Sequence, residues 1–197
     1  MPLISGVRYL IVINRYTKMA EIRINKVEAA RRQIDVAIRL LFSNDDPVAI
    51  HTLSAAGFRI LRDIVHKNKK GRIQQHFKDI IKPGMEKELW KVVNKAANFF
   101  KHADSDADEI LEGVQIEKAN DAMILLACFC YRDLGYQFTP EMGAFMTWSA
   151  ALDPKLLENS PLKDLVKTQE LNSLRSLSRK NQLEVGKNLL SQVRQDA

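Results

Sequence analysis

Glycine and proline are scarce in this 197-residue sequence, with 8 and 6 copies, and aromatic residues make up only 7%. So few turn-forming residues, together with few alternating apolar runs, argue against a protein built from β-sheet. Long segments rich in Ala, Leu, Glu, Lys and Arg instead favour helices. A hydrophobic fraction of 46% is enough to build a core. The composition therefore predicts an all-α globular protein.

Cysteine is almost absent. Its two copies, Cys128 and Cys130, stand as C-x-C in the apolar stretch MILLACFCYRDLG, which lacks the C-x-x-C spacing of metal and redox motifs. On a helix the two thiols point about 200° apart, so we expect buried free thiols of a cytoplasmic protein. No apolar run approaches the roughly 18 residues of a transmembrane span, and we expect no membrane contact.

The beginning of the sequence, MPLISGVRYLIVINRYTK, contains a short apolar core but no small-residue cleavage site. A signal peptide is therefore not expected. Met19 stands just before the first well-formed helical pattern. We interpret residues 1–19 as an N-terminal arm or an over-extended start.

Charge is distributed unevenly. The net charge is +6 and the pI is about 9.3, which permits contact with a polyanion without requiring it. Residues 59–72 carry six Lys or Arg against one Asp, whereas residues 104–117 carry six Asp or Glu and no cation. Two solvated faces explain this pattern. Alternatively, one segment meets an anion and the other meets a basic partner or a second copy of the chain.

Helical periodicity and helix-start signals recur along the chain. Apolar residues follow the i, i+3, i+4, i+7 pattern of a single helical face, and Asp46 and Thr139 each supply an N-cap followed by proline. The expected helices cover about residues 24–42, 47–68, 86–102 and 116–134, followed by helices that begin after Thr139 and Ser160 and by a polar helical tail.

These patterns divide the chain into a helical bundle over residues 20–152 and a helical C-terminal extension over residues 153–197, with Asp153-Pro154 at the joint. The small residues Ser54-Ala-Ala-Gly57 indicate a close helix–helix contact. The predicted core is made of Val27, Ile34, Ile38, Leu41, Leu53, Ile60, Ile64, Val93, Phe100 and Leu126.

The third expected helix carries a polar stripe opposite its apolar face. Lys91, Lys95, Asn98 and His102 follow one another at helical spacing. A solvated face explains such a stripe, and a histidine at a helix C-terminus is favoured by the helix dipole by about 0.3–1 kcal/mol. Alternatively, the stripe ends in a functional site at NFFKHADSD, which begins at Asn98.

Metal binding is not expected. Asp104, Asp106 and Asp108 match the first ligand positions of a calcium loop, but Glu109 and Gln115 stand where that loop needs Gly and Glu. The four histidines, His51, His66, His76 and His102, include no pair at i, i+3 or i+4 spacing.

Three segments carry a family resemblance: AARRQIDVAIRLLF, DPVAIHTLSAAGFRIL and AANFFKHAD. Together, over about residues 25–150, they resemble a group of uncharacterised bacterial helical proteins, and their helix order resembles that of the HEPN superfamily. The resemblance implies a HEPN-like helical bundle that forms a homodimer. The superfamily includes metal-independent ribonucleases, which use no cofactor, and inactive relatives.

Active HEPN members carry an Arg, then four to six residues, then a His near the end of the third core helix. The resemblance places His102 at the position of that His, but Lys95 stands at the six-residue spacing and no Arg is present. Lysine lacks the planar fork with which arginine grips phosphate through two hydrogen bonds. The missing arginine favours a non-catalytic module that binds a nucleotide, a nucleic acid or a protein partner.

A ribonuclease, as a toxin or defence effector, is the alternative. In that hypothesis His102 takes the proton of the RNA 2′-hydroxyl, and Lys95 or Lys101 stabilises the phosphate charge. Asn98 orients the ring or a phosphate oxygen.

Four further residues are candidates for binding. Arg59 and Arg62 belong to the basic segment that would hold an RNA backbone, and Asp104 lies close to His102 in the sequence. His51, near the start of the second helix, is interpreted as a capped surface histidine, with a second group lining the cleft as the alternative.

Overall fold

The computed structural model describes residues 22–68, 86–101, 108–113, 115–153 and 173–195. Within these ranges the chain is all-helical and contains no strand, which confirms the predicted all-α class. The predicted arm over residues 1–19 and the helix start at Ser160 lie outside the described residues.

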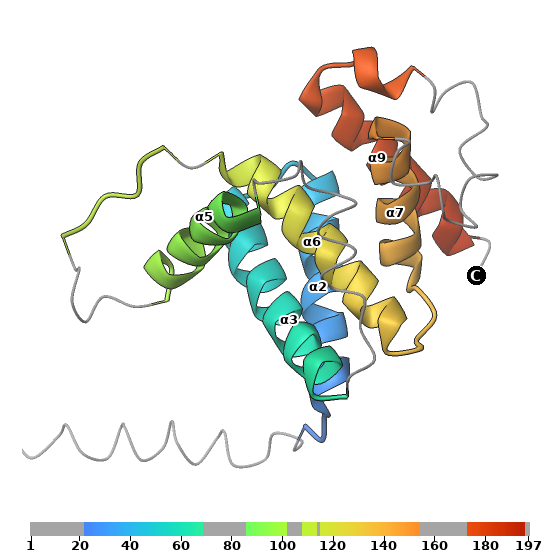
Figure 1. Cartoon of the computed structure of the whole chain (residues 1–197). Coiled ribbons are helices and arrows are strands. Elements are labelled where there is room, and N and C mark those ends of the chain that lie inside the picture. The colour runs from blue at the N-terminus through green and yellow to red at the C-terminus, as the bar shows by residue number, and fades with distance from the viewer. Residues whose placement is uncertain (1–21, 69–85, 102–107, 114, 154–172, 196–197) are drawn as a thin grey trace, which may run out of the picture.

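The helices follow one another in the predicted order (Figure 1). None of those described combines the length and apolar character that crossing a membrane requires. Their bounds are α2 Lys26–Phe42, α3 Pro47–Lys67, α5 Glu86–Phe99, α6 Ile116–Asp133, α7 Pro140–Leu152 and α9 Arg179–Gln195, with a short 3₁₀ turn, η3, at Leu174–Ser176.

Side-chain caps set the starts of α3 and α7. The Asp46 carboxylate accepts a hydrogen bond of 2.8 Å from the backbone N–H of Ala49, and Pro47 occupies the first helical position of α3. Thr139 caps α7 in the same way, with Pro140 next to it. Both predicted cap-plus-proline starts are therefore confirmed.

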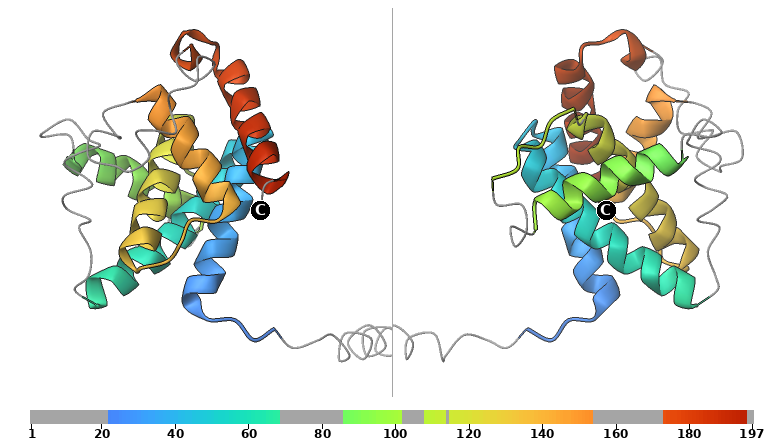
Figure 2. Two further views of the ribbon diagram at one scale, coloured as in Figure 1. Left: turned by 90° about the vertical axis from the view of Figure 1, so that its right-hand side faces the viewer. Right: turned by 60° about the vertical axis from the view of Figure 1, so that its left-hand side comes forward.

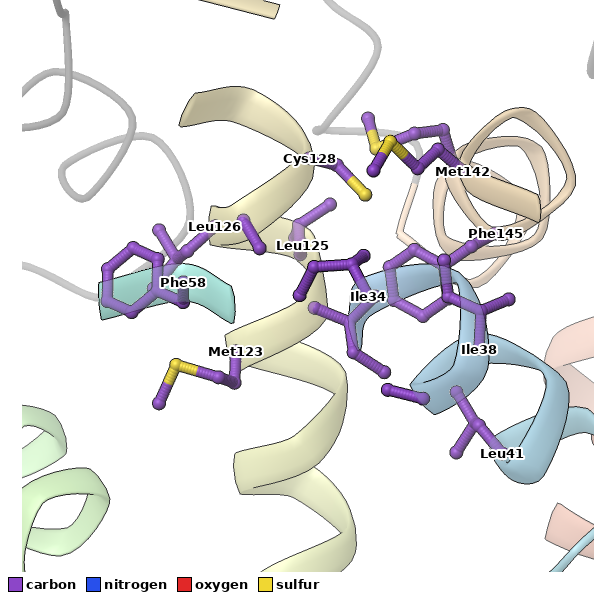
Figure 3. Close-up of a cluster of buried hydrophobic side chains, with 14 of the residues drawn as sticks. Ile34, Ile38, Leu41, Phe58, Met123, Leu125, Leu126, Cys128, Met142 and Phe145 are labelled. Atoms are coloured by element: carbon purple, nitrogen blue, oxygen red, sulfur yellow. The ribbon is translucent and has the colours of Figure 1, made fainter. Parts of the chain in front are cut away.

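α2, α3 and α6 enclose the main core (Figure 3). Ile34 and Ile38 of α2 are fully buried, together with Leu126 of α6. Gly57 brings α3 very close to α2, because a Cβ at that position would lie 2.8 Å from Cδ1 of Ile34. The predicted close contact of the small-residue segment is confirmed.

The predicted core is correct in part. Ile34, Ile38, Leu41 and Leu126 are buried, whereas Val27, Leu53, Ile60, Ile64 and Phe100 are only partly buried, and the side chain of Val93 lies outside the described part of the chain. The largest buried side chains of the described residues, Trp148 and Phe145, were not among the predicted core residues. Both belong to α7, which is covered on most sides and therefore shows no single apolar stripe.

The predicted polar tail is a packed element. Leu183, Gly186 and Leu190 of α9 are buried, and α9 lies against α7 and α2 (Figure 2, left). The indole N–H of Trp148 donates a hydrogen bond of 2.7 Å to the backbone carbonyl of Gln182. Gly186 lies directly against the Phe42 ring of α2.

Ion pairs hold the two ends of α9. Arg179 donates to the Asp121 carboxylate at 2.7 Å and lies over the Trp148 ring, 5.1 Å from its centroid. At the other end, Arg194 and Arg39 both donate to Oε1 of Glu141, at 2.5 Å and 2.6 Å. One carboxylate of α7 therefore joins α9 to α2.

Replacing Gly186 by alanine should destabilise the protein. An added Cβ would lie 2.2 Å from Cε1 of Phe42, and that ring cannot yield because it is buried against Phe145 and Trp148. Overpacking of this kind costs about 1–3 kcal/mol. Urea denaturation of Gly186→Ala against wild type measures the loss.

Gly143→Ala is the matched control, because a Cβ at this helical glycine meets no atom within 4 Å. Alanine is favoured over glycine in a helix by about 1 kcal/mol, so this variant should be as stable as wild type or more stable. Equal stability of the two alanine variants would contradict the packing argument.

The Glu141 bridge should make stability depend on acid pH. Burial acts to raise the pKa of Glu141, but hydrogen bonds from Arg194, its own backbone and Arg39 outweigh burial and hold the pKa below its ordinary value of 4.5. A carboxyl whose folded-state pKa is lowered stabilises the fold above its unfolded pKa, and this contribution is lost as pH falls through the folded value.

Glu141→Gln should therefore cost of order 1 kcal/mol at neutral pH, since both arginines are partly exposed. The difference from wild type should shrink as pH falls below about 4.5. Denaturation curves over this pH range test it, with Glu184→Gln on the exposed side of α9 as a control for loss of a charge. A difference that stays constant down to the lowest pH would count against the bridge.

Candidate functional site

α5 carries the predicted site across the bundle, lying over α3 and α6 (Figure 2, right). Ala96 and Ala97 are buried on its inner side, and these small residues let α5 approach its neighbours closely. The helix ends at Phe99, and the turn continues through Lys101, whose N–H donates to the carbonyl of Asn98 at 3.0 Å. The predicted residues His102 and Asp104 lie outside the described residues.

The outer face of α5 is basic and polar. Lysines and asparagines recur along it every three or four residues, so they form one exposed stripe. Its members are Lys87, Lys91, Asn94, Lys95 and Asn98. Lys95 lies 3.9 Å from the Glu109 carboxylate, and both side chains are about half exposed. A surface pair of this kind contributes little to stability.

Lys101 extends the stripe toward α3. Burial lowers the pKa of the Lys101 ammonium, and the nearby positive charge of Arg59 lowers it further. Arg59 is half-buried and Lys101 is exposed to solvent. Neither forms an ion pair with a carboxylate of the residues that the structure describes. The charges of Arg59 on α3 and of Lys101, just beyond the end of α5, therefore act on each other.

Lys95 and Lys101 do not share one position. Six residues separate them, which places them about 120° apart around α5. Lys95 lies near Glu109, whereas the charge of Arg59 acts on Lys101.

His51 is fully buried, so its interpretation as a capped surface histidine is wrong. It shares the α3 face that meets α6, and its Nδ1 lies 2.8 Å from Oδ1 of Asn120. The Asn120 amide donates to the carbonyl of Pro47 at 2.9 Å, so its oxygen is turned to the ring and His51 donates from Nδ1.

The end of α5 packs on this buried histidine. The Phe100 ring meets His51 edge to face, with centroids 5.8 Å apart. His51 thus supports the turn that carries Lys101. The alternative interpretation, that His51 lines a cleft, finds no support in the described residues.

Arg62 lies one turn beyond Arg59 on α3. It pairs with Asp63 at 2.8 Å and stands 5.9 Å from the centroid of the Phe58 ring. Burial raises the pKa of the Cys130 thiol to about 12, with Asp133 adding to the rise and Arg62 opposing it. The charge of Arg62 therefore acts on the last turn of α6.

Metal ligands do not gather in the described part of the chain: no three His, Cys, Asp or Glu side chains there are placed to hold an ion. Of the three aspartates of the calcium-like loop only Asp108 is described, and it is exposed. Cys128 and Cys130 are buried and free, as the sequence predicted.

Comparison with known proteins identifies no relative: no family model, no curated protein and no solved structure matches the chain. The site is therefore argued from its own residues.

Two features of the site were missed in the sequence. Asn120 stands on α6 one turn before the buried residues Met123 and Ile124, and a polar residue on an apolar face is a signal that could have identified it. The approach of Arg59 to Lys101 left no such signal, because it depends on how α5 crosses α3.

Asn120→Leu should destabilise the bundle, because the leucine leaves His51 Nδ1 and the Pro47 carbonyl without their partner. An unmet buried hydrogen bond costs about 1–3 kcal/mol. Asn98→Leu on the exposed face of α5 is the matched control and should change stability by no more than about 0.5 kcal/mol. Thermal denaturation compares them, and equal effects would refute a structural role for the His51–Asn120 pair.

Proposed function

We propose that this protein is a non-catalytic helical module that binds nucleic acid through the outer face of α5 and the adjoining basic side of α3. The observation that carries the proposal is the stripe of exposed lysine and asparagine side chains on α5, which continues to the exposed Lys101 just beyond the helix end. The positive charge of Arg59 on α3 acts on Lys101 and lowers its pKa. A phosphate bound by both cations would accept charge-assisted hydrogen bonds from them.

The rest of α5 supports a polymer rather than a single phosphate. Its exposed stripe supplies Lys87 and Lys91 as further cations and Asn94 and Asn98 as hydrogen-bonding amides. A row of such side chains follows the regularly spaced charges of a nucleic-acid backbone. The net charge of +6 acts in the same direction.

A HEPN-like bundle that pairs as a homodimer remains part of the proposal. It rests on the sequence resemblance over about residues 25–150 and is compatible with the all-helical chain. The non-catalytic role is favoured because the motif lacks its arginine. Lys95, the lysine at the spacing of that arginine, lies beside the Glu109 carboxylate.

Arg59→Gln and Lys101→Gln should each weaken binding to a short single-stranded RNA. Each variant removes one phosphate contact, so the slope of log affinity against log salt should fall by about 0.7 for a single strand. Fluorescence anisotropy of the labelled RNA over a range of salt concentrations measures both effects.

Lys187→Gln, on the exposed side of α9, removes the same charge elsewhere and should leave the slope unchanged. Absence of RNA binding by the wild type, or an equal effect of all three variants, would refute the proposed interface. Cleavage of the RNA by the purified wild type would overturn the non-catalytic role in favour of the ribonuclease.

A further inference from the structure

The turn between α6 and α7 fixes the backbone of Tyr136 (Figure 1). Gly135 has a positive φ of 91°, its N–H donates to the carbonyl of Arg132 at 2.9 Å, and the N–H of Tyr136 reaches the carbonyl of Tyr131 at 3.4 Å. These two bonds are the Schellman arrangement that ends many helices. Tyr136 therefore occupies a defined position rather than a loose loop.

Tyr136 stacks on Tyr131. The ring centroids are 5.0 Å apart and the planes differ by 22°. Tyr131 is buried, whereas Tyr136 is 44% exposed. The Schellman arrangement is commonly accompanied by an apolar contact between these two positions. A leucine in place of Tyr136 would make that contact as well. An outward-facing aromatic ring goes beyond what the helix end requires.

One arginine follows Tyr131 directly in the chain. Arg132 is exposed, donates to Oε1 of Gln137 at 2.7 Å and lies 5.6 Å from the centroid of the Phe138 ring. Arg31 of α2 lies near Tyr131.

Acidic groups also lie near this turn, but those next to Tyr131 are paired with arginines. The Glu28 carboxylate binds Arg31 at 2.6 Å and Arg32 at 2.8 Å, and Asp35 binds Arg31 at 2.6 Å. The charge of Arg62 on α3 acts on Cys130, the residue before Tyr131.

We infer that the outer face of Tyr136 is a stacking site for an unpaired base of single-stranded nucleic acid. The inference rests on the proposed function and names its ligand class. An aromatic face accepts any base because every base has a π-face, and a rigid ring loses little conformational freedom on binding. Bases inside a duplex are already stacked on both faces, so the site selects single strands.

A sugar-phosphate control separates stacking from charge. The wild type should bind a short single-stranded oligoadenylate about 5-fold or more tightly than an abasic ribose-phosphate oligomer of the same length, the smallest effect expected for one stacked base. Fluorescence anisotropy of the two labelled oligomers gives both affinities. This comparison does not depend on the folding of any variant.

Tyr136→Leu keeps the apolar contact with Tyr131 and removes the π-face. It should lose the preference for oligoadenylate while its affinity for the abasic oligomer stays at the wild-type value. Tyr136→Phe keeps the ring and should keep the preference. Melting temperatures close to wild type establish that both variants are folded.

The outcomes separate the two proposals. Equal affinity of the wild type for both oligomers, or an unchanged preference in Tyr136→Leu, overturns the stacking site and leaves the proposed backbone interface standing. No binding of either oligomer by the wild type overturns both.

Discussion

The close approach of α3 to α2 at Gly57 is the constraint on which the other contacts depend. Only a residue without a side chain lets Ile34 lie at this distance from the α3 backbone. The same contact fixes the rotation of α3, which turns His51 toward Asn120 of α6. The turn that ends α5 then packs on α3 through Phe100, and the charge of Arg59 acts on Lys101 in this turn.

Polar groups inside the bundle define its geometry more narrowly than apolar packing does. Apolar side chains tolerate small displacements, but a buried amide keeps its partners only in one register. Asn120 joins His51 to the first turn of α3, and Thr139 donates to the buried carboxylate of Asp35 at 2.7 Å. Two helix starts, those of α3 and α7, are thereby tied to neighbouring helices.

Much of the fold was predictable, because α2, α3 and α6 each bury one face and therefore show helical periodicity. α7 shows no such periodicity, since it is buried on most sides. The sequence of α9 is mostly polar, and its contact with Phe42 could not be predicted because Phe42 is far away in the sequence. For the candidate site, periodicity placed Lys95 and Asn98 on an exposed stripe. It did not reveal the burial of His51 or the approach of Lys101 to Arg59, because both depend on helix crossings that a single-helix pattern does not contain.

The fit of Gly186 against Phe42 has a consequence for folding. Phe42 ends the first described helix, yet the recess that receives its ring belongs to the last one. Until α9 has packed, the Phe42 ring lacks its contact with Gly186 and the Trp148 indole lacks its hydrogen bond to Gln182. Transiently uncovered apolar surface of this kind is prone to misassembly, and packing of α9 covers it.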